Sequence, residues 1–184
     1  HSIGLGRAEE MQLLPWLGEV MTSETMADLV PLWRSLVDHA AEEFAEWFEW
    51  NDKTRVMTRI NEIPEWWPIY ESLPRTLIHN DFNPRNIGFR RDDEGLRLCA
   101  YDWELATIQV PQRDLVEFLS FMELERYSDD DLMGFIERHR ARLEVLSKQE
   151  LPAGQWMQGF NLALRDFCIN RVPLYLMGHT FRNY

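Results

Sequence analysis

Cysteines, basic residues and long apolar runs are all scarce in this 184-residue chain. The two cysteines, Cys99 and Cys168, exclude a Cys/His zinc cluster and fit a reducing compartment, so we expect a cytoplasmic protein. Because no apolar run approaches the length of a transmembrane helix, we expect no membrane partner. The 19 Lys and Arg against 31 Asp and Glu give a net charge of −12, which argues against a nucleic-acid partner.

The composition is that of a folded chain, with 45% hydrophobic residues and eight Trp. Such a composition excludes disorder, and a chain of this length buries a sizeable core. No repeat, low-complexity tract or boundary is visible, so we expect a single domain over 1–184. Apolar periodicity predicts helices over 26–50, 53–61, 65–72, 113–126, 128–147 and 153–170, a broken helix over 9–19, and an end or kink at Pro173.

One segment reads as a β-hairpin rather than a helix. Residues 87–91 form the first predicted strand and 96–101 the second, and the turn between them contains Gly95, which can adopt a positive φ. Cys99 is expected to be a small core residue on the second strand. The predicted fold class is therefore mainly α with a small β-hairpin, an α+β arrangement.

The segment that precedes this hairpin, residues 79–86, reads His-Asn-Asp-Phe-Asn-Pro-Arg-Asn. Pro84 restricts its own φ and that of the residue before it, so the loop can aim Asp81 and Asn86 at one point. The hairpin would return Asp102, which lies sixteen residues after Asn86, to the same place. Phosphoryl transfer from ATP requires these groups, a base for the acceptor hydroxyl and two oxygen ligands for Mg²⁺.

Residues 77–119 resemble the catalytic segment of the aminoglycoside phosphotransferase and choline kinase family, the small-molecule branch of the protein-kinase-like fold. The shared pattern is His-x-Asp, four residues and Asn, followed by an Asp on a strand with an aromatic and an acid after it. Asn80, Asn83 and Trp103-Glu104 depart from the protein-kinase pattern and favour the small-molecule branch. Pro111 to Leu115 matches a further family element.

The resemblance implies roles for four residues. Asp81 would be the catalytic base, and His79 would orient the loop. Asn86 and Asp102 would bind Mg²⁺, and ATP would donate the phosphoryl group.

Four neighbouring residues have less defined roles. Glu104 would support the metal site or be a solvated acid. Asn83 and Arg85 would contact phosphate or serve the loop alone. By resemblance, Asp114 opens a helix and braces the catalytic loop, and we also expect it to cap that helix.

The resemblance covers the C-terminal lobe of the kinase-like fold only. The 78 residues before His79 contain no glycine-rich hairpin, and Lys53 is their only lysine. A complete enzyme would need the N-terminal lobe of a parent protein as a partner, and this fragment alone would be inactive.

An acidic stripe follows the predicted helix over 26–50 and would attract a cationic acceptor. Its members recur at steps of three and four residues, opposite an apolar stripe, and are Asp38, Glu42, Glu46, Glu49 and Asp52. The alternative is a solvated face of an amphipathic helix. In the same way, Trp66, Trp67 and Trp156 would either line a pocket or fill the core.

We therefore expect an ATP-dependent phosphotransferase lobe that acts on a hydroxyl of a small molecule, such as an aminoglycoside or a choline-like amine. Two alternatives remain open: a non-catalytic kinase-like binding module or half-kinase that does not use ATP, and a helical interaction domain whose loop only resembles the motif. The sequence upstream of His1 would discriminate, because a glycine-rich strand pair with a lysine would favour the enzyme.

Overall fold

A computed structural model of the protein describes residues 1–2, 4–5, 7, 17, 20–46, 50–93 and 95–182. The chain forms two compact units, each of which combines two segments of the sequence. We call His1–Val20 with Leu73–Phe160 the loop-bearing unit, and Met21–Ser72 with Asn161–Tyr184 the helical unit. Helix α8 (Ala153–Asn170) contributes residues to both. The broken helix predicted over 9–19 lies almost wholly outside the described residues.

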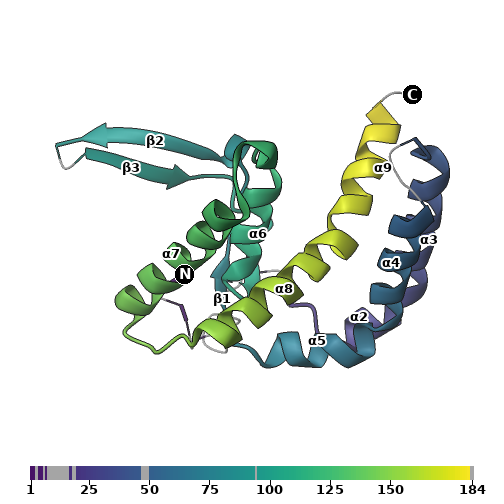
Figure 1. Ribbon diagram of the computed structural model, residues 1–184, viewed down its shortest axis with the longest axis horizontal. Helices are drawn as coiled ribbons and strands as arrows, with labels where there is room; N and C mark the ends of the chain where they lie inside the picture. Colours follow the sequence, from purple (N-terminus) through teal and green to yellow (C-terminus); the bar gives the residue numbers. More distant parts are fainter. Residues whose placement is uncertain are drawn as a thin grey trace. The chain divides into compact units, whose positions relative to one another are not determined.

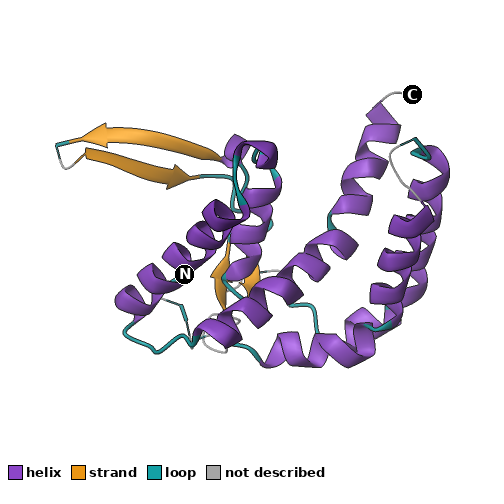
Figure 2. Ribbon diagram, viewed as in Figure 1, coloured by secondary structure: helices purple, strands orange, loops and turns teal. Residues whose placement is uncertain are grey.

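The loop-bearing unit combines two small antiparallel sheets with helices (Figures 1 and 2). Its elements besides α8 are β1 (Thr76–Ile78), η1 (Pro84–Asn86), β2 (Ile87–Asp92), β3 (Gly95–Ala100), β4 (Thr107–Gln109), α6 (Gln112–Ser120), η2 (Leu124–Arg126) and α7 (Asp129–Ser147). The predicted fold class, mainly helical with small β structure, is confirmed.

The pair β1–β4 was not expected from the sequence. Leu77 of β1 lies opposite Ile108 of β4, and Ile78 lies opposite Thr107. Ile78 and Ile108 are almost fully buried, at 0% and 1% exposure. These short strands are rich in β-branched residues, which pack well on a pleated surface.

The predicted hairpin is confirmed as β2 and β3. Phe89 lies opposite Leu98, and Gly95 begins β3 with a φ of +120°. The hairpin is nevertheless exposed, with Phe89 at 71% and Leu98 at 51% of their full surface. The expectation that Cys99 is a core residue was wrong, because its side chain is exposed.

Two helices of this unit test the predicted boundaries. The helix expected over 113–126 ends earlier, because α6 stops at Ser120 and a separate 3₁₀ turn covers Leu124–Arg126. Helix α7 is confirmed with its capping box: Ser128 accepts from the Asp131 N–H, and Asp131 accepts from the Ser128 N–H. A hydrophobic core joins α6, α7 and α8, and its buried members are Leu5, Leu119, Ile136, Leu143, Leu151 and Trp156.

The helical unit shows that the single helix predicted over 26–50 was wrong. Three elements replace it: α2 (Ser23–Asp28), α3 (Val30–Glu43) and the start of α4 (Trp50–Asn61). Pro31 explains the break after α2, because proline suits the first turn of a helix but not its interior.

The same unit contains α5 (Ile63–Ser72) and α9 (Val172–Arg182). Pro173 lies in the first turn of α9, so it begins a further helix after α8. Helix α3 packs against α4 and α9 and buries the predicted apolar stripe through Trp33, Val37 and Ala40. In the described part of the chain, no helix is both long and apolar enough to cross a membrane.

Trp66 and Trp67 of α5 are core residues rather than pocket walls. They are 3% and 1% exposed, and their ring centroids lie 5.2 Å apart. Tyr70 packs edge-on against Trp67, and its hydroxyl donates to Asp166 Oδ2 at 3.3 Å. Trp156, the third tryptophan in question, is also buried, at 4%.

Candidate active site

The loop between β1 and β2 is stabilised by its own polar side chains. Asn83 precedes the 3₁₀ turn Pro84–Asn86, and its side-chain oxygen accepts from the Arg85 N–H at 3.1 Å. The Asn83 N–H in turn donates to the Asp81 carbonyl at 3.0 Å. Asn83 is fully buried. Its place in the loop is that of a scaffold residue, which is one of the two roles considered from the sequence.

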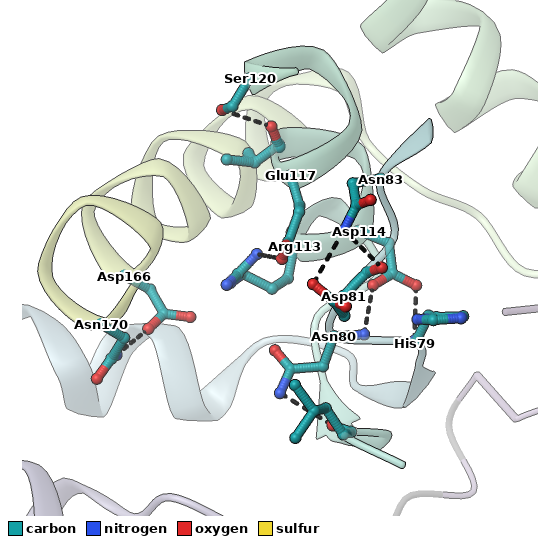
Figure 3. A network of polar contacts seen from close by, with 12 residues as sticks. His79, Asn80, Asp81, Asn83, Arg113, Asp114, Glu117, Ser120, Asp166 and Asn170 are labelled. Atoms are coloured by element: carbon teal, nitrogen blue, oxygen red, sulfur yellow. Dashed lines mark hydrogen bonds and ion pairs between the residues drawn. The ribbon is translucent and has the colours of Figure 1, made fainter. Parts of the chain in front are cut away.

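The carboxylate of Asp81 is held by two amides of the same loop. Asn83 Nδ2 donates to one oxygen at 3.0 Å, and Asn86 Nδ2 donates to the other at 2.6 Å. Figure 3 shows the bond from Asn83 to Asp81. The loop therefore brings Asp81 and Asn86 into direct contact. Because Asn86 uses its amide nitrogen for Asp81, its amide oxygen is the atom left to bind a cation.

His79 ties this loop to the segment that carries Asp102. Its ring is buried, and Nε2 lies 2.8 Å from the Tyr101 carbonyl. Since a carbonyl only accepts, Nε2 carries the proton in this bond. The ring also packs against Trp103 and Phe82, at centroid distances of 4.7 and 5.8 Å.

Asp114 binds the start of the loop from α6. Its two carboxylate oxygens accept from the backbone N–H groups of His79 and Asn80, both at 2.8 Å (Figure 3). His1 Nε2 lies 2.9 Å from the same carboxylate. Burial raises the pKa of Asp114, but the hydrogen bond and charge of His1 and the two backbone bonds outweigh it, so the pKa is lowered. Asp114 makes no cap to its own helix, contrary to expectation.

His139 of α7 contacts Asp114 indirectly, through His1. Its Nε2 lies 3.3 Å from His1 Nδ1, and its ring packs edge-on against Trp156. Burial, aided by the nearby His1, lowers the pKa of His139 to about 4, although Asp114 acts in the opposite direction. His139 is therefore neutral at physiological pH.

Asp102 lies where the second strand of the hairpin returns to the loop. The Tyr101 N–H donates to the Asn86 carbonyl at 3.1 Å, and the Tyr101 hydroxyl donates to the Arg85 carbonyl. Asp102 itself is exposed and adopts a left-handed backbone conformation with a φ of 65°. Among the contacts of the described residues, none joins its carboxylate to Asp81 or Asn86. The backbone thus brings Asp102 next to the loop, while its side chain faces solvent.

The oxygen donors at this position fit Mg²⁺ by their chemistry. The Asn86 amide oxygen and the Asp102 carboxylate are hard ligands of the kind that Mg²⁺ prefers, and it retains waters for the remaining positions. Within the described ranges, no group of three or more His, Cys, Asp or Glu forms a metal site. A pair made of one carboxamide and one carboxylate is not a group of that kind, so the two observations are compatible.

The remaining predicted residues lie around the loop or apart from it. Glu104 is exposed. Arg85 is exposed as well; its Nε lies 3.3 Å from Asn83 Oδ1, and its guanidinium lies over the Phe121 ring. These contacts give Arg85 a role within the loop.

The acidic stripe is not continuous, because α3 ends at Glu43 and α4 begins at Trp50. Asp38 pairs with Lys53 at 2.7 Å, so part of its charge is balanced. Glu42 and Glu46 are exposed, and Glu49 lies outside the described residues.

Sequence reasoning missed three groups that complete the loop's surroundings. They come from three residues: the carbonyl and hydroxyl of Tyr101 count as one, the Trp103 ring on His79 is the second, and the Asn80 amide, which donates to the Leu105 carbonyl at 3.0 Å, is the third. A signal was available for the first two, because aromatic residues flank Asp102 on both sides. Asn80 also adopts a left-handed φ, of 59°, which Asn tolerates better than most residues.

Comparison with known proteins places this loop in a family context. The sequence profile described as the phosphotransferase enzyme family matches residues 14–155, more than half of the chain. The matched range includes the loop, both sheets, α6 and α7. No curated protein and no solved structure matches the chain. On the strength of the profile match, the chain belongs to the phosphotransferase enzyme family.

Proposed function

We propose that this chain is the C-terminal, acceptor-binding lobe of an ATP-dependent phosphotransferase of the kinase-like fold. It would transfer the γ-phosphoryl group of ATP to a hydroxyl of a small molecule. The observation that carries this proposal is the pair of amide hydrogen bonds from Asn83 and Asn86 to the Asp81 carboxylate. We call this pair the amide clamp. The loop that contains it is bound to α6 through Asp114.

The amide clamp holds the Asp81 carboxylate in one orientation, as a catalytic base requires. Each Asp81 oxygen accepts one amide hydrogen and keeps a second lone pair for an acceptor hydroxyl. As the hydroxyl oxygen bonds to the γ-phosphorus and the bond to the β-phosphate oxygen breaks, the hydroxyl proton passes to Asp81. Asn83 and Asn86 hold the carboxylate throughout, so positioning supplies most of the rate enhancement.

Asn86 and Asp102 would hold Mg²⁺, which when bound offsets the negative charge of the phosphates. His79 contributes indirectly, because its bond to the Tyr101 carbonyl fixes the segment that carries Asp102. The proposal also requires a lysine and a glycine-rich loop over the phosphates. The sequence before His79 has no glycine-rich loop, and its single lysine, Lys53, lies in helix α4 and pairs with Asp38. We propose that an N-terminal lobe of a parent protein supplies them.

Two substitutions in a protein with both lobes separate the proposed roles. Asp81→Asn should reduce kcat by at least about 1000-fold and leave Mg-ATP affinity nearly unchanged, because the base acts on the acceptor. Asp102→Asn should weaken Mg-ATP binding as well. Asp93→Asn, in the exposed turn of the hairpin, is the matched control for charge. Equal and mild effects of the first two changes would refute both assignments.

A kinase-like binding module that does not use ATP is the second candidate function. The exposed Asp102 carboxylate, without contact to Asp81, is the observation that favours it. Calorimetric titration with Mg-ATP distinguishes the two candidates. The enzyme proposal expects weak binding and no turnover by this chain alone, and tight binding with turnover once both lobes are present. No binding by the longer protein would favour the module.

The acceptor is proposed to be a small molecule that carries a cationic group. Glu42 and Glu46 are exposed acids and would attract such an acceptor at long range. The double variant Glu42→Gln with Glu46→Gln should then lower kcat/KM, as should added salt, since screening acts over about 8 Å at physiological ionic strength. If neutral acceptors react equally well, the two glutamates serve only solubility.

A further inference from the structure

Arg85 is a charged side chain of the candidate site that the proposed mechanism does not use. It lies on the loop directly before Asn86 and is exposed. Its Nε donates to Asn83 Oδ1 at 3.3 Å, and its guanidinium lies 5.7 Å from the centre of the Phe121 ring. The two terminal nitrogens carry four further N–H donors, which have no acceptor among the residues that the structure describes. A guanidinium held in this way can bind a planar carboxylate through two parallel hydrogen bonds.

The side chain of Asn83 joins this arginine to the proposed base. Its amide oxygen accepts from Arg85 Nε, and its amide nitrogen donates to Asp81 Oδ1 at 3.0 Å (Figure 3). Because a single planar amide group separates them, Arg85 Nε lies within about 9 Å of Asp81 Oδ1. Asn83 is fully buried, so its amide holds both partners at a fixed place in the loop. A ligand of a few atoms can therefore reach Asp81 and Arg85 together.

The two oxygens of Asp81 have different neighbours. Oδ1 accepts from Asn83, which also binds Arg85, whereas Oδ2 accepts from Asn86, one of the two proposed Mg²⁺ ligands. The metal, and the phosphates that it would bind, belong to the Oδ2 side. The hydrogen bonds thus connect Arg85 to the oxygen that is not next to the metal ligand. This favours the acceptor, rather than ATP, as the molecule that Arg85 binds.

We propose that Arg85 binds a carboxylate of the acceptor, so that the site takes a small hydroxy acid. The acceptor hydroxyl would lie at Asp81, and the carboxylate would accept from the terminal nitrogens of Arg85. With a hydrogen bond of about 2.8 Å at each end, roughly two to four carbon atoms fit between the two groups. This assignment rests on the proposed function in placing the acceptor hydroxyl at Asp81. A hydroxy acid that also has an ammonium group fits the cationic acceptor proposed above.

The experiment is an NMR titration of the ¹⁵N-labelled chain with 4-hydroxybutyrate, without nucleotide. The arginine Nε–H signals are followed, and Arg85→Lys identifies the one of interest. We expect a saturable shift of that signal. The matched ligand, 4-hydroxybutyramide, has a neutral amide in place of the carboxylate and should bind at least about tenfold more weakly, because hydrogen bonds to a charged group are stronger. Butyrate, which lacks the hydroxyl, should bind about fivefold more weakly.

A variant pair tests the protein side of the same contact. Arg85→Gln should weaken 4-hydroxybutyrate binding at least about tenfold, whereas Arg90→Gln, which removes the same charge from an exposed position of the hairpin, should not weaken it. The acid and the amide compared on the unchanged protein keep the test valid even if Arg85→Gln fails to fold. The proposal is overturned if no saturable shift appears, if the two ligands bind equally, or if both variants weaken binding equally.

Kinetics in a protein with both lobes distinguish the acceptor from ATP. Arg85→Gln should raise the KM of a hydroxy acid about tenfold and leave the KM of Mg-ATP nearly unchanged. A rise in the KM of Mg-ATP alone would assign Arg85 to the phosphates and overturn the proposal. The titration contains no nucleotide, so its result does not depend on phosphoryl transfer. Failure of the proposed function would appear instead as a mild effect of Asp81→Asn on kcat.

Discussion

The two small sheets of the loop-bearing unit hold the loop that carries Asp81 in opposite ways. The pair β1–β4 has three residues per strand and buries Ile78 and Ile108 almost completely. The hairpin β2–β3 has six residues per strand and leaves most of its side chains in solvent, including Phe89. An isolated two-stranded hairpin is marginally stable in water. The longer sheet, the hairpin, is therefore not the one that supports the loop more firmly.

The difference lies in what each sheet is attached to. At the end of β1, the backbone of His79 and Asn80 is bound by the Asp114 carboxylate, which fixes it to α6. The base of the hairpin is attached through Tyr101, which donates to the carbonyls of Asn86 and Arg85 and accepts from His79. The start of the loop that carries Asp81 thus depends on a buried carboxylate, whereas Asp102 depends on the bonds of Tyr101, whose side chain is half exposed.

The largest effect should come from removing the Asp114 carboxylate. Asp114→Ala would leave the N–H groups of His79 and Asn80 without acceptors. This should lower the free energy of unfolding by about 4 kcal/mol. Urea unfolding measures this loss. The control Asp93→Ala removes the same charge from the exposed turn of the hairpin and should change stability by less than about 0.5 kcal/mol. If both variants unfold at the same urea concentration, Asp114 is not the support described here.

The next largest effect should come from buried apolar side chains, which differ between the two sheets. Ile108→Ala in β4 deletes buried methyl groups and should cost about 3 kcal/mol. Phe89→Ala in β2 removes a larger side chain from an exposed position and should cost less than about 0.5 kcal/mol, because little apolar surface returns to water. A large loss for Phe89→Ala would mean that a partner covers this face of the hairpin in solution.

Mild acid should destabilise the buried side of the site through His139. Its folded pKa, about 4, lies below its ordinary value of 6.5 because of burial, so the unfolded chain binds the proton more readily. The free energy of unfolding has its full His139-linked value above pH 6.5. It falls by about 3 kcal/mol as the pH drops towards 4. Unfolding curves at pH 7 and pH 4 should therefore differ, and His139→Gln should remove most of the difference. His39→Gln, at an exposed position, should leave the difference unchanged.

The lowered pKa of Asp114 acts in a separate window. Its ionised form contributes stability above the unfolded pKa of about 3.9, and that contribution is lost only as the pH falls through the lower folded pKa. A loss confined to values below pH 4 would therefore point to Asp114 rather than His139.

The smallest effect should come from the base of the hairpin. Tyr101→Phe removes the hydroxyl bond to the Arg85 carbonyl, at about 1 kcal/mol. Amide hydrogen exchange should accelerate about fivefold in β2 and β3 and stay unchanged in β1 and β4. Equal acceleration in both sheets would show that they open as one unit, against the comparison drawn above.

The parts of the fold that the sequence predicted well are those fixed by neighbouring residues. Helix α7 follows from its capping box, and the hairpin follows from Gly95 between two strand-like segments. The pair β1–β4 could not be read in this way, because Leu77 and Ile108 meet across a long stretch of chain. The break before α3 had a local signal in Pro31, which the amphipathic period over 26–50 concealed.

In the candidate site too, contacts within one segment were predictable and contacts between distant segments were not. The motif predicts Asp81 and Asn86 together, and their contact lies within one loop. The bonds of His79 to Tyr101 and of Asp114 to the loop join distant segments, and only the family resemblance suggested the second. The environment of Asp102 could not be inferred from spacing alone, since its exposure depends on where the return strand ends.

The left-handed backbone at Asn80 and Asp102 limits which residues evolution or mutagenesis can place there. Glycine, asparagine and aspartate tolerate this conformation, whereas β-branched residues do not. Backbone shape therefore acts as a filter at position 102, which disfavours β-branched side chains and favours glycine, asparagine and aspartate. A saturation library at positions 80 and 102, selected for folding alone, should be enriched in these three residues before any selection for catalysis is applied.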